Sequence, residues 1–386
     1  MTVLQIIWFV LVAVLWIGYL ILEGFGIGAG MIMRMVAKND KERTQVQKTY
    51  GPVWDGNEVW LLTAGGATFA AFPEWYATMF SGMYLALFLV LLCLIVRICA
   101  IEWRSKVASP VWRDRWDIGQ TIAAWLVPIL LGVAFANLVK GMNIAVVDPR
   151  EPGTPIPVTE GTTPDLSQYI HNFVGEGAPL NNVFLSLLTP FTILGGLAIC
   201  AVFLAQGALF LSIRTTGEVH TRSVALAKQL TIIDTLLVAV FAVWGQFAYA
   251  TSVLSWIPLV IAALAIIAAA AQAQLGKSLG AFLLHCVAIL GAVVWVFLAM
   301  FPNVMKSDFG GKGWNQSYSL QIADAAASQA TLTVMLVVAI ILVPTVLGYT
   351  YWAYSRMPLR IGIDDVESNA GLPWDKIRAG ASFLSA

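Results

Sequence analysis

Residues 51–72 read GPVWDGNEVWLLTAGGATFAAF, a stretch in which two carboxylates and two tryptophans open an apolar, glycine-containing segment. Whether this stretch crosses a membrane decides the topology of the whole chain. Without it, the basic residues of 34–48 and those of 104–115 would lie on opposite sides. A carboxylate at membrane depth is costly, and it is usually buried in protein and usually functional. Asp55 and Glu58 are therefore the first candidate functional residues.

The composition predicts an integral membrane protein. Hydrophobic residues make up 59% of the chain and charged residues 11%, with a mean hydropathy of +0.79, whereas soluble domains are roughly half apolar and a quarter charged. Lys+Arg and Asp+Glu balance at 22 each, so the net charge indicates no nucleic-acid partner. The four cysteines are scattered without paired spacing, which favours small buried hydrophobes over a disulfide or metal framework. Residues 1–22 lack a basic leader and a cleavage site, and are expected to form a retained span.

Nine segments are apolar enough to be spans, if the short second one is shielded by protein. They cover residues 4–30, 56–72, 76–100, 118–139, 183–212, 229–250, 254–274, 279–301 and 329–354. The sequence thus predicts an all-α integral membrane protein with about nine transmembrane helices. We expect two helix bundles plus a peripheral helix, within a single transmembrane domain over 1–386.

The positions of the basic residues test this topology. With nine spans, seventeen of the 22 Lys and Arg residues fall on one side, four fall on the other, and Arg97 lies inside a span. The positive-inside rule then predicts an outside N-terminus and a cytoplasmic C-terminus. Residues 140–182 and 302–328 become external loops, and 356–386 becomes a cytoplasmic tail. The proline-rich first loop is expected to be irregular.

Three carboxylates are candidates for a proton pathway. Glu23 lies in the first span, among glycines at 24, 26, 28 and 30 that permit close helix contact. It is either a bundle-facing residue satisfied by its neighbours or a member of a proton relay or ion site. Asp55 and Glu58 are three residues apart, so they share a helix face and can exchange a proton near neutral pH. Alternatively, Asp55 caps the helix N-terminus; a cap can also belong to a relay.

Other polar residues are predicted to be structural. Arg97 either snorkels to the cytoplasmic surface or forms a buried ion pair. Asp324, with Ser328 and Gln329, opens the last span, where capping or interhelical hydrogen bonding is expected. Asp234, in the sixth span, is a lesser relay candidate.

The histidines give little support for a haem in this chain. A six-coordinate haem generally needs two axial ligands, and His285 is the one histidine within a predicted span. We expect His285 to be a hydrogen-bonded bundle residue. The sequence also has no His, Cys and carboxylate cluster with metal-ligand spacing.

The chain resembles the second subunit of cytochrome bd-type quinol oxidases. The resemblance rests on motifs that occur in family order across nearly the whole chain. They are WDGNEVW at 54–60, TAGGA at 63–67, FSGMY at 80–84, WRSK at 103–106, WDIG at 116–119, GVAFAN at 132–137, QGA at 206–208, RTTGEVH at 214–220, AMFP at 299–302 and SQATL at 328–332.

This resemblance implies a respiratory complex in the bacterial cytoplasmic membrane that oxidises quinol and reduces dioxygen to water. It implies that a larger partner subunit holds the haems, of b and d type, and the site of quinol oxidation. The second subunit of such complexes stabilises this partner, supplies carboxylates to a proton path from the cytoplasm and can offer an apolar route for dioxygen. A bound quinone and a small accessory subunit occur in some members.

Two residues fall on acidic positions of the family. Asp55 matches the proton-path aspartate, and Glu23 matches an acidic position of the first span. The family often has Gly-Phe-Asp where this chain has Gly24-Phe-Gly26, so a second carboxylate is missing there. A secondary transporter that binds coupling ions at the same acids, and a purely structural scaffold, are the alternative functions.

Overall fold

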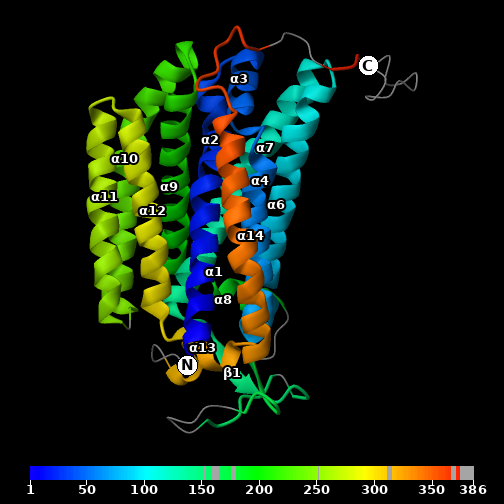
Figure 1. Cartoon of the computed structure of the whole chain (residues 1–386), viewed down its shortest axis with the longest axis vertical. Helices are drawn as coiled ribbons and strands as arrows, with labels where there is room; N and C mark the ends of the chain where they lie inside the picture. Colours follow the sequence, from blue (N-terminus) through cyan, green and yellow to red (C-terminus); the bar gives the residue numbers. More distant parts are fainter. Residues whose placement is uncertain are drawn as a thin grey trace.

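The structure, a computed structural model, describes residues 1–151, 153–158, 165–174, 180–250, 252–310, 315–366 and 371–373. Its long helices lie side by side, and the N-terminus and residues 356–366, which follow the last long helix, are at opposite ends (Figure 1). Eight helical segments of the described chain are long and apolar enough to cross a membrane. The predicted class, an all-α integral membrane protein, is confirmed.

The first bundle contains the helices before residue 141. They are α1 (Val3–Leu22), α2 (Gly24–Val36), α3 (Asp40–Tyr50), α4 (Trp54–Ala71), α5 (Pro73–Gly82), α6 (Tyr84–Trp103) and α7 (Pro110–Lys140). The first predicted span is therefore broken at Glu23, and the third is broken between α5 and α6 at Met83. The seventh helix begins earlier than predicted, because Ser109 caps it and Pro110 occupies its first turn.

The second bundle follows a short helix, α8 (Leu180–Ser186). It contains α9 (Pro190–Arg214), α10 (Gly217–Ala248), α11 (Trp256–Gln274) and α12 (Ser278–Met300). The predicted span 183–212 was wrong at its start, because the chain breaks before Pro190 and Thr189 caps the new helix. The polar stretch 217–228 continues α10 beyond the predicted span at the end that carries α3.

Glycines join the two bundles. A Cβ atom at Gly28 of α2 would lie 1.8 Å from the carbonyl oxygen of Phe203 on α9, and one at Gly132 of α7 would lie 2.5 Å from the carbonyl of Gly195 on α9. Only glycine permits such close backbone approach. The close helix contact predicted for the glycines of the first span is confirmed.

α4 corresponds to the second predicted span and runs antiparallel to α1. Near its start, Asn57 donates to the Leu22 carbonyl at 2.8 Å. At its other end, the Ala71 carbonyl accepts from Ala327 at 2.9 Å, beside the first turn of α1, where Gln5 contacts Ala323. α4 thus follows α1 for its full length, although it is less apolar than the eight other spans.

The last long helix, α14 (Gln329–Ser355), is peripheral. It lies against α1 and α4, and Leu332 is its one buried residue. This agrees with the predicted arrangement of two bundles plus a peripheral helix.

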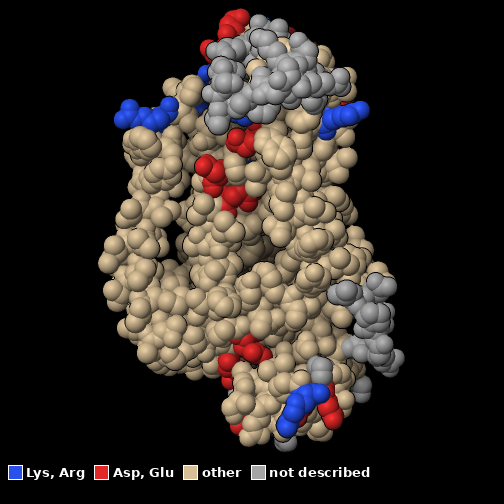
Figure 2. Space-filling view, turned by 90° about the vertical axis from the view of Figure 1, so that its right-hand side faces the viewer, with Lys and Arg blue, Asp and Glu red and all other residues tan. Residues whose placement is uncertain are grey.

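A small layer covers the end of the bundles that contains the N-terminus. It consists of two antiparallel strand pairs and a short helix: β1 (Ile144–Val147) with β2 (Ile170–Phe173), β3 (Asn303–Ser307) with β4 (Asn315–Gln321), and α13 (Ile322–Ala325). The expectation of a wholly irregular 140–182 loop was wrong, since β1 and β2 pair across it and α8 lies at its end. Much of its proline-rich middle lies outside the described residues. On the face shown in Figure 2, a band without charged side chains separates a lower group of charged residues from an upper group, whose carboxylates reach into the body of the molecule.

Candidate functional site

A buried cluster of one cation and two carboxylates lies where α1 meets α2. Arg97 of α6 forms ion pairs with Glu23, at the junction of α1 and α2, and with Glu58 of α4, whose Oε1 lies 3.0 Å from Nη1. The Arg97 and Glu23 side chains are 0% and 1% exposed, and Glu58 is 11% exposed. The buried ion pair predicted as one alternative for Arg97 is confirmed, and the snorkelling alternative is wrong.

The charges of this cluster do not balance. One guanidinium neutralises one carboxylate, so the second carboxylate would remain as an uncompensated buried charge when both are ionised. An uncompensated charge at this depth is costly, and a carboxylate can avoid the cost by binding a proton. The cluster can therefore hold one exchangeable proton shared between Glu23 and Glu58.

The helix break at Glu23 exposes backbone groups that other helices satisfy. Gln206 of α9 donates to the Ile21 carbonyl at 2.9 Å, and Asn57 of α4 donates to the Leu22 carbonyl at 2.8 Å. Both amide side chains are buried. Each satisfies a carbonyl that would otherwise cost free energy in an apolar interior. Neither amide was predicted from the sequence to have a role, although intramembrane Asn and Gln are recognisable signals of interhelical bonding.

Asp55 lies outside the buried cluster. Its side chain is exposed in this chain and accepts a hydrogen bond from the backbone N–H of Gly56 at 2.7 Å. The N-cap position of α4 belongs to Val53, so the capping role considered for Asp55 was wrong. Asp55 and Glu58 do lie on one side of α4, yet the boundary between exposed and buried surface passes between them. Asp55 is thus on the outer surface, one helical turn from the buried cluster.

Gly26 lies against the cluster. A Cβ atom at this position would be 3.3 Å from Arg97 Nη2 and 3.3 Å from Glu23 Oε1. The position where this chain departs from the Gly-Phe-Asp pattern is therefore in direct contact with the ion pair. A side chain there would press on the Arg97–Glu23 contact.

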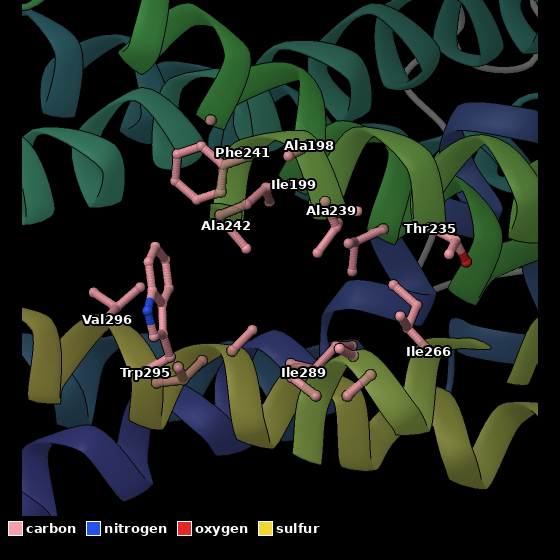
Figure 3. A pocket seen from close by; sticks show the side chains of 18 of the residues that line it. Ala198, Ile199, Thr235, Ala239, Phe241, Ala242, Ile266, Ile289, Trp295 and Val296 are labelled. Atoms are coloured by element: carbon pink, nitrogen blue, oxygen red, sulfur yellow. The ribbon is translucent and has the colours of Figure 1, made fainter. Parts of the chain in front are cut away.

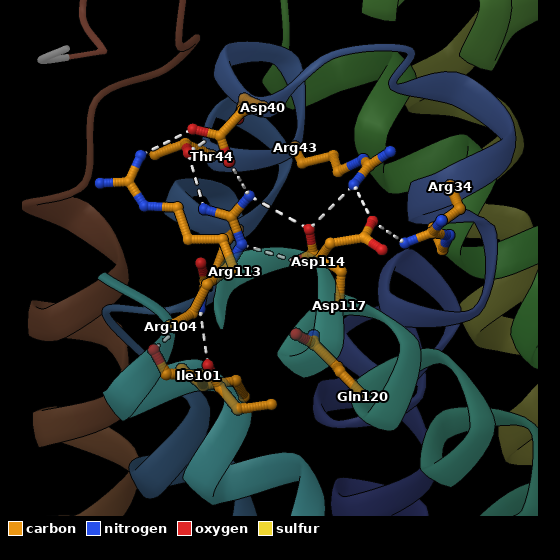
Figure 4. Close-up of polar contacts among 12 residues, drawn as sticks. Arg34, Asp40, Arg43, Thr44, Ile101, Arg104, Arg113, Asp114, Asp117 and Gln120 are labelled. Atoms are coloured by element: carbon orange, nitrogen blue, oxygen red, sulfur yellow. Dashed lines mark hydrogen bonds and ion pairs between the residues drawn. The ribbon is translucent and has the colours of Figure 1, made fainter. Parts of the chain in front are cut away.

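A second ionic network holds the segment that leads into α4 (Figure 4). Arg104 bonds Asp117 of α7 at 2.6 Å and Asp40 of α3 at 2.7 Å, while Arg43 of α3 bonds Asp114 at 2.8 Å and Asp117 at 3.2 Å. Arg104 and Asp117 are fully buried. The network connects α3 to α7 and to the residues that directly follow α6, and α3 in turn leads into α4. The charge pattern had placed the arginines of this network on one side of the membrane, but it did not predict their acidic partners.

Glu42 belongs to the same end of the molecule. Burial acts to raise the pKa of its carboxyl, but hydrogen bonds from the Lys38 backbone and from Arg222 outweigh burial and lower the pKa. Glu42 is therefore a fixed anion of α3 that holds α10 through Arg222 at 2.7 Å.

Asp234 and His285 form a separate buried pair in the second bundle. His285 Nε2 lies 2.7 Å from Asp234 Oδ2, which confirms His285 as a hydrogen-bonded bundle residue. His285 lines an apolar cavity of about 150 Å³ between α9, α10, α11 and α12 (Figure 3). Pockets that hold larger ligands are roughly 300–1,000 Å³. This site does not fit a haem, because the cavity is small and the Nε2 atom of His285 is already hydrogen-bonded to Asp234.

Within the described residues, no group of three or more His, Cys, Asp or Glu side chains could hold a metal ion. Asp324 lies in α13 rather than on the last span, so the capping expected at the start of this span comes from Ser328 and not from Asp324. Burial raises the pKa of the half-buried Asp324 carboxyl. Gln329 donates to Thr2 at 3.0 Å, which is the interhelical bond expected of it.

The fold and the buried cluster define this chain as a helical protein with several membrane spans and a buried ionic site. Its sequence from residue 4 to 357 matches the family described as cytochrome bd terminal oxidase subunit II. The chain belongs to this family.

Two relatives and one structure show the extent of the similarity. The chain is 34% identical to cytochrome bd-I ubiquinol oxidase subunit 2 of Escherichia coli (strain K12), over 95% of this chain and 97% of the relative. It is 34% identical to cytochrome bd ubiquinol oxidase subunit 2 of Bacillus subtilis (strain 168), over 92% and 96%. A chain of the bd oxidase from Geobacillus thermodenitrificans has a similar fold, with a TM-score of 0.68 at 13% identity over 91% of this chain and 97% of that chain. The transporter and scaffold alternatives are not favoured.

Proposed function

We propose that this subunit carries protons from the cytoplasmic side towards a haem-bearing partner subunit in a quinol oxidase that reduces dioxygen to water. The observation that supports the proposal is the unbalanced Glu23–Arg97–Glu58 cluster, one helical turn from the exposed Asp55. Asp55 receives the proton at the surface, and the cluster holds it in the interior.

The exposed face of α4 is the surface on which we place the partner. Asp55, Val59, Leu62, Gly66 and Phe69 recur at helical spacing and are all exposed in this chain. Large exposed apolar side chains on one face are suited to burial against lipid or a second subunit, and an exposed carboxylate among them is suited to a polar contact with protein. On this placement, Asp55 takes up the proton at the subunit boundary, and the cluster one helical turn away holds it close to the partner.

The haems, of b and d type, are assigned to the partner. The poor fit of a haem at His285 supports this assignment, as does the position of the other two histidines, His171 in β2 and His220 at the basic end of α10. The quinol substrate follows from the names of the relatives, which are called ubiquinol oxidase subunits. A bound quinone and a small accessory subunit remain expectations from the family resemblance.

Dioxygen access is a secondary role in this proposal. An apolar cavity of about 150 Å³ excludes water and admits small apolar molecules. The cavity of Figure 3 has this character and lies in the second bundle.

The test is the rate of quinol-driven oxygen consumption per haem in the purified complex. We expect Asp55→Asn and Glu23→Gln to lower this rate by roughly 10-fold or more, as removal of a proton-transfer group does, with haem content and subunit stoichiometry unchanged. The matched control is Glu218→Gln, a carboxylate of α10 that is 73% exposed. Unchanged rates in both variants would remove these residues from the proton path. Loss of haem together with rate would instead favour the scaffold role.

A further inference from the structure

The break in the first span is linked to the peripheral helix through one hydrogen-bonded chain. The Tyr354 hydroxyl, near the end of α14, donates to Asn57 Oδ1 at 2.8 Å, and the amide of Asn57 donates to the Leu22 carbonyl at 2.8 Å. Leu22 directly precedes Glu23. The helices α1, α4 and α14 are thus connected next to Glu23, the first residue of the buried cluster along the chain.

Tyr354 satisfies the end of the Asn57 amide that Leu22 leaves free. An asparagine side chain has an oxygen that accepts and a nitrogen that donates. The Leu22 carbonyl can only accept, and the Tyr354 hydroxyl satisfies the amide oxygen from the opposite side. With this donor in place, the orientation that directs the NH₂ group to Leu22 satisfies both ends of the amide.

The ring of Tyr354 is held independently of its hydroxyl. Its edge contacts Phe25, in the first turn of α2, with ring centroids 6.3 Å apart and planes at 83°. Phe25 in turn stacks on Phe210 of α9 at 4.2 Å. Removing the hydroxyl therefore leaves the ring packing in place, and the effect of the hydrogen bond can be tested separately from packing.

We propose that Tyr354 is a positioning residue for the Glu23–Arg97–Glu58 cluster. Through Tyr354, the position of α14 controls the orientation of the Glu23 side chain towards Arg97. The inference rests on the proposed proton-carrying function of that cluster. Tyr354 contacts neither carboxylate by a hydrogen bond that the described residues show; it acts through Asn57 and the backbone of Leu22.

The test is Tyr354→Phe in the whole complex, with oxygen consumption measured per haem. We expect the maximal rate to fall roughly 3- to 10-fold, the effect of one lost positioning hydrogen bond, while the KM for quinol and the haem content stay at wild-type values. We also expect the pH profile of the maximal rate to shift, which a purely structural role would not cause. The titratable and charged groups around the cluster are Glu23, Glu58, Arg97, Tyr19 and Tyr50, with Arg214 near Tyr354.

Two further variants separate the possible outcomes. Tyr351→Phe, on the same helix but 78% exposed, is the matched control and should behave as wild type. Tyr354→Phe added to Glu23→Gln should slow the enzyme no further than Glu23→Gln alone, because both act on one element. If Glu23→Gln slows the enzyme and Tyr354→Phe leaves both rate and pH profile unchanged, the positioning role is overturned while the proton path stands. If Tyr354→Phe prevents assembly or lowers haem content, Tyr354 is a structural residue; if neither variant slows the enzyme, both proposals fail.

Discussion

Glu58 Oε1 lies 3.0 Å from Nη1 of Arg97, although 39 residues separate the two along the chain. The same guanidinium also pairs with Glu23 on its Nη2 side. The planar guanidinium of Arg97 can bond two carboxylates at once. A lysine ammonium cannot form both contacts with the same geometry. It is therefore the residue on which the arrangement of α1, α4 and α6 at this depth depends.

Replacing Arg97 with methionine is expected to destabilise the subunit strongly. Arg97→Met leaves two buried carboxylates without a cation, and breaking a buried ion pair by removing one partner costs about 3–5 kcal/mol. Thermal unfolding of the complex measures the loss. Arg97→Lys should recover part of the stability, because it restores the charge but not the two-sided contact.

The control for Arg97→Met is Arg150→Met. Arg150 pairs with Asp148 in the outer layer, and its side chain is 86% exposed, so its removal should leave the unfolding temperature close to the wild-type value, because exposed ion pairs contribute little. Equal unfolding temperatures for wild type and Arg97→Met would contradict the structural role given to the buried cluster.

The sequence predicted the membrane class, the helical architecture and the individual acids, because hydropathy and charge position are local properties. It did not predict which side chains meet. Arg97 remained undecided between snorkelling and pairing because its partners come from other helices, and helix neighbours are set by packing over the whole bundle. The spacing of Asp55 and Glu58 indicated one helix side, but the line between buried and exposed surface depends on how α4 is rotated against α1. Asn57, Gln206 and Tyr354 were missed for the same reason.

Introducing an acid at position 26 tests the departure from the family pattern. Gly26→Asp alone should slow oxygen consumption, because its Cβ atom would press on Arg97 and Glu23 at 3.3 Å and add a third carboxylate beside one cation. Combined with Glu23→Gln, the same substitution should restore part of the rate, because the new carboxylate can take over the proton that Glu23 held.

The matched control for this rescue is Gly26→Ala in the Glu23→Gln background, which adds the Cβ atom without the acid. The rate per haem should remain low in this variant. If Gly26→Ala restores the rate as well as Gly26→Asp does, the effect comes from packing, and position 26 has no proton-carrying capacity.

The β1–β2 sheet of the outer layer is expected to loosen in acid because of His171. This side chain is 2% exposed, and burial lowers its pKa from 6.5 to about 4. Above pH 6.5 the histidine is neutral in both the closed and the opened sheet, so stability is at its full value. As the pH falls from 6.5 towards 4, the opened state binds a proton that the closed state does not, and roughly 3 kcal/mol of stability is lost.

Amide hydrogen exchange of residues 144–147 and 170–173, corrected for intrinsic rates at pH 7, 5.5 and 4.5, measures this loss. His171→Phe should remove the pH dependence and His220→Gln should keep it, whereas equal protection of the wild-type strands at all three pH values would show that His171 does not control the sheet.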